Sequence, residues 1–101
     1  MQALRVANYK ITRGTFPELV GEAKGGMLKT FRDQPGFIRY GLADTGEGTC
    51  LSISVWETHA QAEAAAPVAA TWVREHIADR VELRANEVGD LAFYEGALAT
   101  V

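Results

Sequence analysis

The apolar positions of this chain recur with two periods, one typical of strands and one typical of helices. Residues 4–12 carry apolar side chains in weak alternation, which predicts a β-strand with both faces partly covered. Thr15 and Glu18 have the spacing of a helix capping box, and Pro17 suits a first helical turn. The helix that begins there has an apolar stripe with nearly 3.6-residue spacing, made of Phe16, Leu19, Val20, Ala23, Met27 and Phe31.

Two adjacent glycines, Gly25 and Gly26, interrupt the middle of this first helix. Each glycine costs roughly 1 kcal/mol relative to alanine in a helix interior. The pair therefore predicts either a kink or a close approach to another stretch of backbone. Pro35 and Gly36 end the helix, since proline cannot continue it and glycine suits a stop.

A predicted hairpin follows. It consists of strands over residues 37–43 and 49–57, joined by a turn over 44–48 that contains two glycines. The second strand has two different faces, on which Leu51, Ile53 and Val55 alternate with Ser52, Ser54 and Trp56. Because small polar residues stand where charges would be usual, we expect the serine face to be only partly solvated.

The second predicted helix opens at Thr58 and Gln61, which repeat the capping-box spacing. Its thin apolar stripe consists of Ala62, Ala65, Ala66, Ala69, Val73 and Ile77. Pro67 lies inside this stretch. An interior proline removes a backbone hydrogen bond, so we expect a break or two short helices.

The end of the chain predicts one more strand. The pattern over residues 79–86 is ambiguous, whereas residues 88–96 alternate. The two faces of this last strand carry Leu91 and Phe93, alternating with Ala92 and Tyr94.

This order is a twofold repeat of a strand-helix-strand unit. It predicts an α+β, ferredoxin-like βαββαβ fold in a single domain over residues 1–101, with a four-stranded antiparallel sheet and both helices on one face. The other sheet face is then uncovered. Since Tyr9, Tyr40, Phe93 or their strand neighbours must occupy it, a monomer would expose an unusually large apolar patch. We therefore expect a symmetric homodimer.

Composition and charge limit the kinds of partner that we expect for this chain. The chain has 101 residues, a net charge of -3 and ten Lys and Arg residues without a basic stripe, so we expect no nucleic-acid partner. There is no apolar run long enough to cross a membrane and no signal-like start, so we expect no membrane partner and a cytoplasmic location. Cys50 is the single cysteine, and we expect it to be a packed hydrophobe.

Four segments carry a resemblance to a known family. They are Asn8 to Thr15 (NYKITRGT), Gln34 to Phe37 (QPGF), Ser54 to Thr58 (SVWET) and Gly89 to Glu95 (GDLAFYE). In these segments the chain resembles the antibiotic biosynthesis monooxygenase family of dimeric α+β barrels. The resemblance implies that fold and a dimer. Members of the family include cofactor-free oxygenases of quinols and polyketide phenols, haem-degrading enzymes and proteins with no assigned activity.

Two polar residues are candidates for catalysis. Asn8 lies on the first strand, where an amide is disfavoured and needs a partner if buried. The alternative is that it only satisfies a backbone group at a strand bend. The family's haem-degrading branch has an asparagine at this point. His76 can act as a base near neutral pH, or it can be a solvent-exposed residue at a helix end.

Three aromatic residues are candidates for substrate binding. Trp72 lies four residues before His76, so both can face one cavity between helix and sheet. Tyr40 and Arg39 occupy opposite faces of a strand, and one of them must point inward. For Trp56 we expect a dimer interface more than a cavity wall. Tyr94 is a weaker candidate for a hydrogen bond to substrate.

The first functional hypothesis is a cofactor-independent monooxygenase of a quinol, anthrone or similar phenol, in which Asn8 and His76 act. The second is a non-catalytic dimer that binds a small apolar ligand. The third is haem degradation, which the run of alanines over residues 64–66 opposes, because the haem-degrading branch has a tryptophan there. We expect no cofactor and no metal: His59 and His76 are 17 residues apart, and the helical glycines form no phosphate loop.

Overall fold

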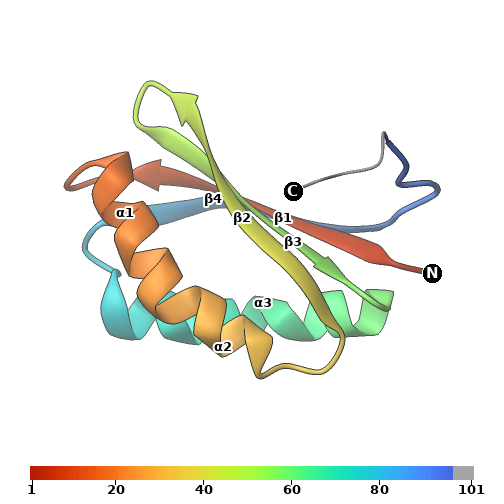
Figure 1. The fold of residues 1–101 in the computed structure, drawn as a ribbon. Helices are drawn as coiled ribbons and strands as arrows, with labels where there is room; N and C mark the ends of the chain where they lie inside the picture. Colours follow the sequence, from red (N-terminus) through yellow and green to blue (C-terminus); the bar gives the residue numbers. More distant parts are fainter. Residues whose placement is uncertain (97–101) are drawn as a thin grey trace.

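The structure is a computed structural model that describes residues 1–96, and Figure 1 shows two strand-helix-strand units. The strands are β1 (Ala3–Ile11), β2 (Phe37–Gly46), β3 (Thr49–Trp56) and β4 (Val81–Asp90). The helical segments are α1 (Phe16–Glu22), η1 (Ala23–Met27), α2 (Leu28–Arg32) and α3 (His59–His76). The predicted ferredoxin-like fold is confirmed.

The four strands form one antiparallel sheet in the order β2-β3-β1-β4. The α1–α2 stretch and α3 lie together on one face of it (Figure 1). Directly opposed residues of antiparallel strands share a face. The pairs Leu4 with Val55 and Val6 with Ile53 point away from the helices, because their strand neighbours belong to the core that packs against the helices.

An aromatic cluster fills the core at one end of the sheet. Phe31 of α2 is fully buried and lies edge-on to Tyr40 and Trp56, with ring centroids 5.2 and 5.3 Å apart. Phe37 packs on Trp56 at 5.5 Å. Edge-to-face pairs are stabilising because the positive edge of one ring meets the negative face of the other. Tyr40 is therefore the inward residue of the pair Arg39 and Tyr40.

The first helix begins with the predicted capping box. The N–H of Thr15 donates to the Glu18 carboxylate at 2.8 Å, and the N–H of Glu18 donates to the Thr15 hydroxyl at 3.4 Å. The bonds from Thr15 lower the pKa of Glu18. The helix changes to a π-helical turn at Ala23–Met27, which contains both glycines, before α2 resumes.

The prediction of a break at Pro67 is wrong, because α3 runs unbroken from His59 to His76. Proline removes one hydrogen bond, to the carbonyl four residues earlier, and in an exposed stretch water can replace it. The second capping box is half formed. The Thr58 hydroxyl accepts from the N–H of Gln61 at 3.1 Å, but Oε1 of Gln61 is buried without a hydrogen-bond partner among the described residues.

The predicted last strand is wrong in its position. The structure forms β4 at Val81–Asp90, and residues 91–96 are outside any strand. The reason is that β4 is an edge strand that pairs only with β1, so most of its side chains are exposed and no alternation shows in the sequence. Phe93 and Tyr94 are both largely exposed.

The hairpin is tighter than predicted. β2 continues to Gly46, and only Glu47 and Gly48 form the turn, with φ of 53° and 76°. Positive φ at both positions is typical of the turns that match strand twist.

Within residues 1–96, no helix has the length and apolar character needed to cross a membrane. Cys50 is buried and unpaired, as expected.

Candidate functional site

A small cavity lies between the helices and the sheet. Its sheet side includes Tyr9, Tyr40 and Ser52, and its helix side includes Met27 and Trp72. The volume is about 30 Å³. Since one water molecule needs roughly 10–15 Å³ by this measure, the cavity holds about two. A ring-sized ligand must therefore displace side chains in order to enter.

The polar groups of this cavity are hydroxyls and a thiol. Burial raises the pKa of Tyr40 to about 12, and the Ser52 hydroxyl beside it acts in the opposite direction. Burial also raises the pKa of Cys50, and the charge of Asp44 adds to this. Both groups therefore keep their protons at neutral pH. Among the described residues that line the cavity there is no carboxylate or imidazole, so the site offers hydrogen bonds but no strong base.

Trp72 forms a wall between this cavity and the outside. It is 7% exposed and lines both the cavity and an open groove of about 490 Å³ on the outer surface of the helices. Thr30 of α2 and Pro67 of α3 line the same groove. A movement of this indole would join the two spaces.

His76 lies on the outer side of that wall. Its ring stacks on the indole of Trp72 at 4.7 Å, and its Nδ1 donates to the carbonyl of Trp72 at 2.9 Å. The side chain is exposed. Trp72 and His76 both line the outer groove. The expected cavity between helix and sheet is lined by Trp72 but not by His76, because the ring of His76 leaves the helix toward solvent.

Asn8 lies on the opposite side of the sheet. It pairs with Leu51 and Ala85, and its neighbours Ala7 and Tyr9 are the buried residues that face the helices. Strand alternation therefore turns the amide toward the uncovered face. The structure does not bring Asn8 and His76 together, and the catalytic role of each stays a prediction.

The expectation of an interface position for Trp56 is wrong. The side chain is completely buried inside one chain, and its indole N–H donates to the Ser54 hydroxyl at 2.9 Å. Strand register explains this, because Trp56 is opposed to Ala3 and Phe37 on the helix-covered face. Trp56 is also not among the described residues that line the cavity.

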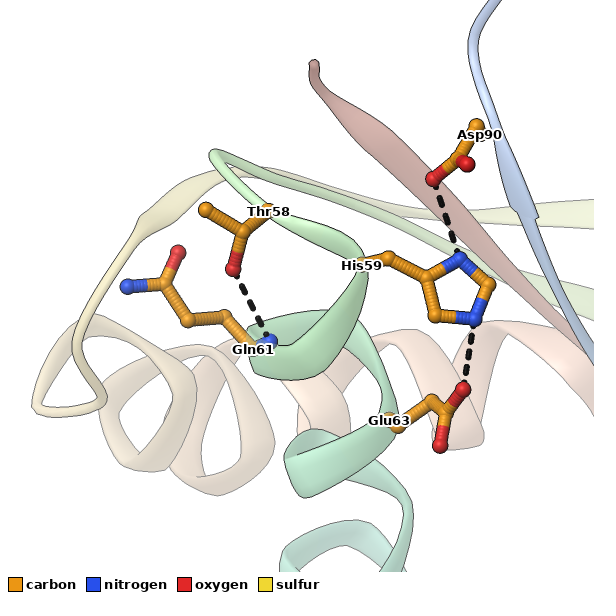
Figure 2. Close-up of polar contacts among 5 residues, drawn as sticks. All are labelled: Thr58, His59, Gln61, Glu63 and Asp90. Atoms are coloured by element: carbon orange, nitrogen blue, oxygen red, sulfur yellow. Dashed lines mark hydrogen bonds and ion pairs between the residues drawn. The ribbon is translucent and has the colours of Figure 1, made fainter.

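His59 joins the start of α3 to the end of β4. Figure 2 shows its ring between two carboxylates: Nδ1 lies 3.0 Å from Asp90, and Nε2 contacts Glu63 one turn along the helix. The hydrogen bond to Asp90 is the main reason that the pKa of His59 is raised. The side chains are largely exposed, so this is a surface clamp. No group of three or more metal-ligating side chains occurs within residues 1–96.

Neither Tyr9 nor Arg5 was given a place at a site in the sequence analysis. Tyr9 or its strand neighbours were expected on the uncovered face, and the structure puts Tyr9 in the cavity and its neighbours on the uncovered face. Arg5 is only 2% exposed, although an arginine in a small domain is normally at the surface. The alternation of side chains along a strand did contain this signal. Arg5 lies on the same face of β1 as Ala3, Ala7 and Tyr9, which form its buried face.

Neither a scan against protein-family models nor a search of curated proteins finds a match for the sequence. Solved structures match in shape. SnoaB, a cofactor-independent oxygenase from Streptomyces nogalater, is 18% identical, with a TM-score of 0.64 over 96% of this chain and 96% of SnoaB.

Two further solved structures have the same shape. A candidate antibiotic biosynthesis monooxygenase from Chloroflexus aurantiacus is 13% identical, with a TM-score of 0.66 over 95% of this chain and 98% of that one. A heme-degrading protein from Mycobacterium tuberculosis is 18% identical, with a TM-score of 0.62 over 95% and 100%. The chain therefore has the ferredoxin-like α+β fold of antibiotic biosynthesis monooxygenase-like proteins.

Proposed function

We propose that this protein is a cofactor-independent monooxygenase that oxidises an anthrone, quinol or similar electron-rich phenol with O₂. One observation carries the proposal: the small cavity between helices and sheet is apolar except for protonated hydroxyl groups and the Cys50 thiol, and Tyr40 provides the phenol among them. The fold shared with SnoaB, a cofactor-independent oxygenase, supports it.

Most of this oxidation depends on the reactivity of the substrate itself, and the protein needs to supply few groups. An anthrone loses a proton from its CH₂ carbon, and the resulting anion gives one electron to O₂. The substrate radical and superoxide combine to a peroxide at that carbon, and loss of water leaves a carbonyl. One oxygen atom ends in the quinone and the other in water. The protein must bind the ring, stabilise the anion and exclude bulk water.

The cavity residues suit these tasks. The phenol of Tyr40 keeps its proton and can donate to the oxygen on which the substrate's negative charge develops. Ser52 lies beside it as a second hydroxyl. Trp72 gives the substrate a route, since its indole separates the cavity from the outer groove. His76 on the outer side of that indole is within reach of a ligand entering through the groove.

The second candidate function is non-catalytic binding of a small apolar ligand. The absence of carboxylate and imidazole groups from the described cavity lining favours it, because the substrate must then supply its own acidity. Tight retention of a phenol without O₂ consumption is the result that this alternative expects.

The residues present do not fit haem. The described lining of the cavity between helices and sheet carries no imidazole to ligate iron, and His76 faces the outer groove instead. Haem therefore has no part in the proposed reaction. A haemin titration without a shift of the Soret band is the expected result.

We propose a homodimer built on the uncovered sheet face. The side chains of Leu4, Val6, Leu51 and Ile53 lie together there and are all half-buried in one chain. A second copy of this face would bury them fully, and a twofold axis makes such a surface complementary to itself.

The test is O₂ consumption with anthrone and with a hydroquinone, in the presence of EDTA. We expect a rate well above that of buffer alone with at least one of these substrates and, in the quinone formed from anthrone, one carbonyl oxygen from O₂. Asn8→Ala and His76→Ala test the two predicted catalytic residues: a marked loss in either supports its role, and unchanged rates in both remove both from the mechanism. No acceleration with any of these substrates contradicts the proposed function.

A further inference from the structure

Arg5 is a buried cation without an ion-pair partner among the described residues. The residue is 2% exposed in the middle of β1, and its Nε and Nη1 atoms have no hydrogen-bond partner among residues 1–96. Burying a guanidinium group without an anion costs free energy, since the lost hydration is not replaced. Native proteins pair such groups almost always, so an unpaired one calls for an explanation such as a bound water, ion or ligand.

Arg5 lines a further groove. This groove has a volume of about 280 Å³ and lies between α3 and the β1–β4 side of the sheet. Ala66, Pro67 and Ala70 of α3 line it, and these short side chains leave the space above β1 unfilled. The groove adjoins the outer groove of Trp72 at Pro67, which lines both, and Tyr9 lies between it and the small cavity, since Tyr9 lines both of those.

The chemistry of the walls selects a class of ligand. Arg5 is the only charged residue among the described lining residues, and Asn86 adds one amide. A single guanidinium pairs best with a carboxylate, because its two parallel N–H groups match the two oxygens. Leu83, which is 50% exposed, and the alanines offer apolar contact for the rest of the molecule.

We propose that the Arg5 groove binds a small organic monocarboxylate whose carboxylate pairs with Arg5 and whose apolar body lies under Pro67. A phosphate ester fits less well, because it carries a second charge that no further cation in the described lining meets. The site is independent of the proposed oxygenase activity, and its test measures binding and not turnover.

The experiment uses sodium benzoate as the probe and benzamide as its neutral counterpart, in low-chloride buffer at pH 7. We expect benzoate to bind saturably by calorimetry, to shift the backbone amide resonances of β1 and of residues 66–70, and to raise the unfolding temperature. Benzamide should bind at least about tenfold more weakly, because it lacks the charge. No saturable binding of benzoate at millimolar concentrations overturns the proposal.

Three variants assign the binding to this groove. Arg5→Met removes the charge but keeps the length, so we expect benzoate binding to fall at least tenfold and the ligand-free protein to unfold at the same or a higher temperature. Ala70→Phe fills the groove from an exposed position of α3 and leaves Arg5 intact, and it should abolish binding too. Arg74→Met removes an exposed charge of the same helix and should bind as the unchanged protein does.

The outcomes separate the explanations. Equal benzoate affinity in Arg5→Met overturns the proposal, and so does equal affinity in Ala70→Phe. If Arg5→Met does not fold, Ala70→Phe decides: lost binding supports the site, and retained binding refutes it. None of these results depends on O₂ consumption, so the oxygenase proposal can fail while this one stands.

Discussion

Gly26 lies against the indole ring of Trp72, so closely that a Cβ atom on Gly26 would be 2.8 Å from Nε1 of Trp72 and nearer still to Cζ2. The π-helical turn at Ala23–Met27 and the position of Trp72 are therefore coupled. Since this indole also stacks on His76, the glycine holds the wall between the cavity and the outer groove in place.

Gly26→Ala should destabilise the protein. The new methyl group collides with Trp72, and overpacking of this kind costs about 1–3 kcal/mol, against a gain in helix propensity of about 1 kcal/mol. We expect a net loss on the order of 1 kcal/mol and a changed tryptophan fluorescence spectrum. Urea denaturation measures the first and emission spectra the second.

Gly25→Ala is the matched control, since nothing lies within 4 Å of a Cβ at that position. It should stabilise the protein by about 0.5–1 kcal/mol through propensity alone. If both alanine variants are equally stable, the contact between Gly26 and Trp72 does not constrain the helix.

Tyr40 should make the folded state sensitive to alkali. Its pKa is raised from 10.0 to about 12 by burial, so the folded protein holds this proton when the unfolded chain has lost it. Its contribution is fully present below pH 10 and is lost as pH rises toward 12. Two units of pKa correspond to roughly 2–3 kcal/mol.

Urea denaturation at pH 9 and pH 11 measures this loss of stability, which should be smaller in Tyr40→Phe. Tyr94→Phe is the control, because Tyr94 is 59% exposed and lies outside the sheet. A loss of the same size in Tyr40→Phe and in the unchanged protein assigns the effect to other groups.

The contacts of His59 with Asp90 and Glu63 should stabilise the folded state at low pH and not at high pH. Asp90 and Glu63 raise the pKa of His59, so the folded protein binds this proton more tightly than the unfolded chain does. The resulting stabilisation is fully present below about pH 6.5 and is lost as pH rises through the raised pKa of the folded state.

Asp90→Asn removes the carboxylate that raises the pKa of His59 most (Figure 2). The substitution should lower stability more at pH 5.5 than at pH 8.5. Glu75→Gln is the control, since Glu75 is exposed and lies at the other end of α3 from His59. A pH-independent difference between the Asp90→Asn and unchanged proteins speaks against a charged clamp.

Ile53→Glu should prevent the proposed dimer. Ile53 lies on β3 next to Val6, in the middle of the uncovered face, and two copies across a twofold axis would bring carboxylates together. Like charges at an interface cost several kcal/mol, so the dissociation constant should rise at least about a hundredfold.

Light scattering during gel filtration should give the mass of two chains for the unchanged protein and of one chain for Ile53→Glu. Ala60→Glu, on the exposed side of α3, should leave the mass unchanged. A single-chain mass for the unchanged protein at micromolar concentration contradicts the dimer.

The fold followed from the sequence where one face of each element is buried. The capping box at Thr15 and the hairpin strands are local signals, and both were found. β4 was misplaced because an edge strand with exposed side chains leaves no period to detect. The predicted break in α3 was wrong because one proline costs less free energy than is gained by packing an 18-residue helix on the sheet.

The site was harder to predict because it depends on which face each side chain takes. Tyr40 and Trp72 were expected near a pocket, and both line the cavity. Asn8 follows the buried Ala7 directly in the sequence, and successive side chains of a strand point to opposite faces of the sheet. Asn8 therefore points away from the cavity. Arg5 was missed because composition places arginine outside, and only the register shows it inside.

The most direct test of the proposed oxygenase compares Tyr40→Phe with Tyr94→Phe in O₂ consumption with anthrone. The Tyr40 phenol is the hydroxyl that we propose as the main donor to the developing negative charge. Loss of such a donor lowers the rate by about 10²-fold. We predict a kcat/KM about a hundredfold below that of the unchanged protein for Tyr40→Phe and an unchanged value for Tyr94→Phe. Equal values for all three proteins would contradict the cavity as the site of oxidation.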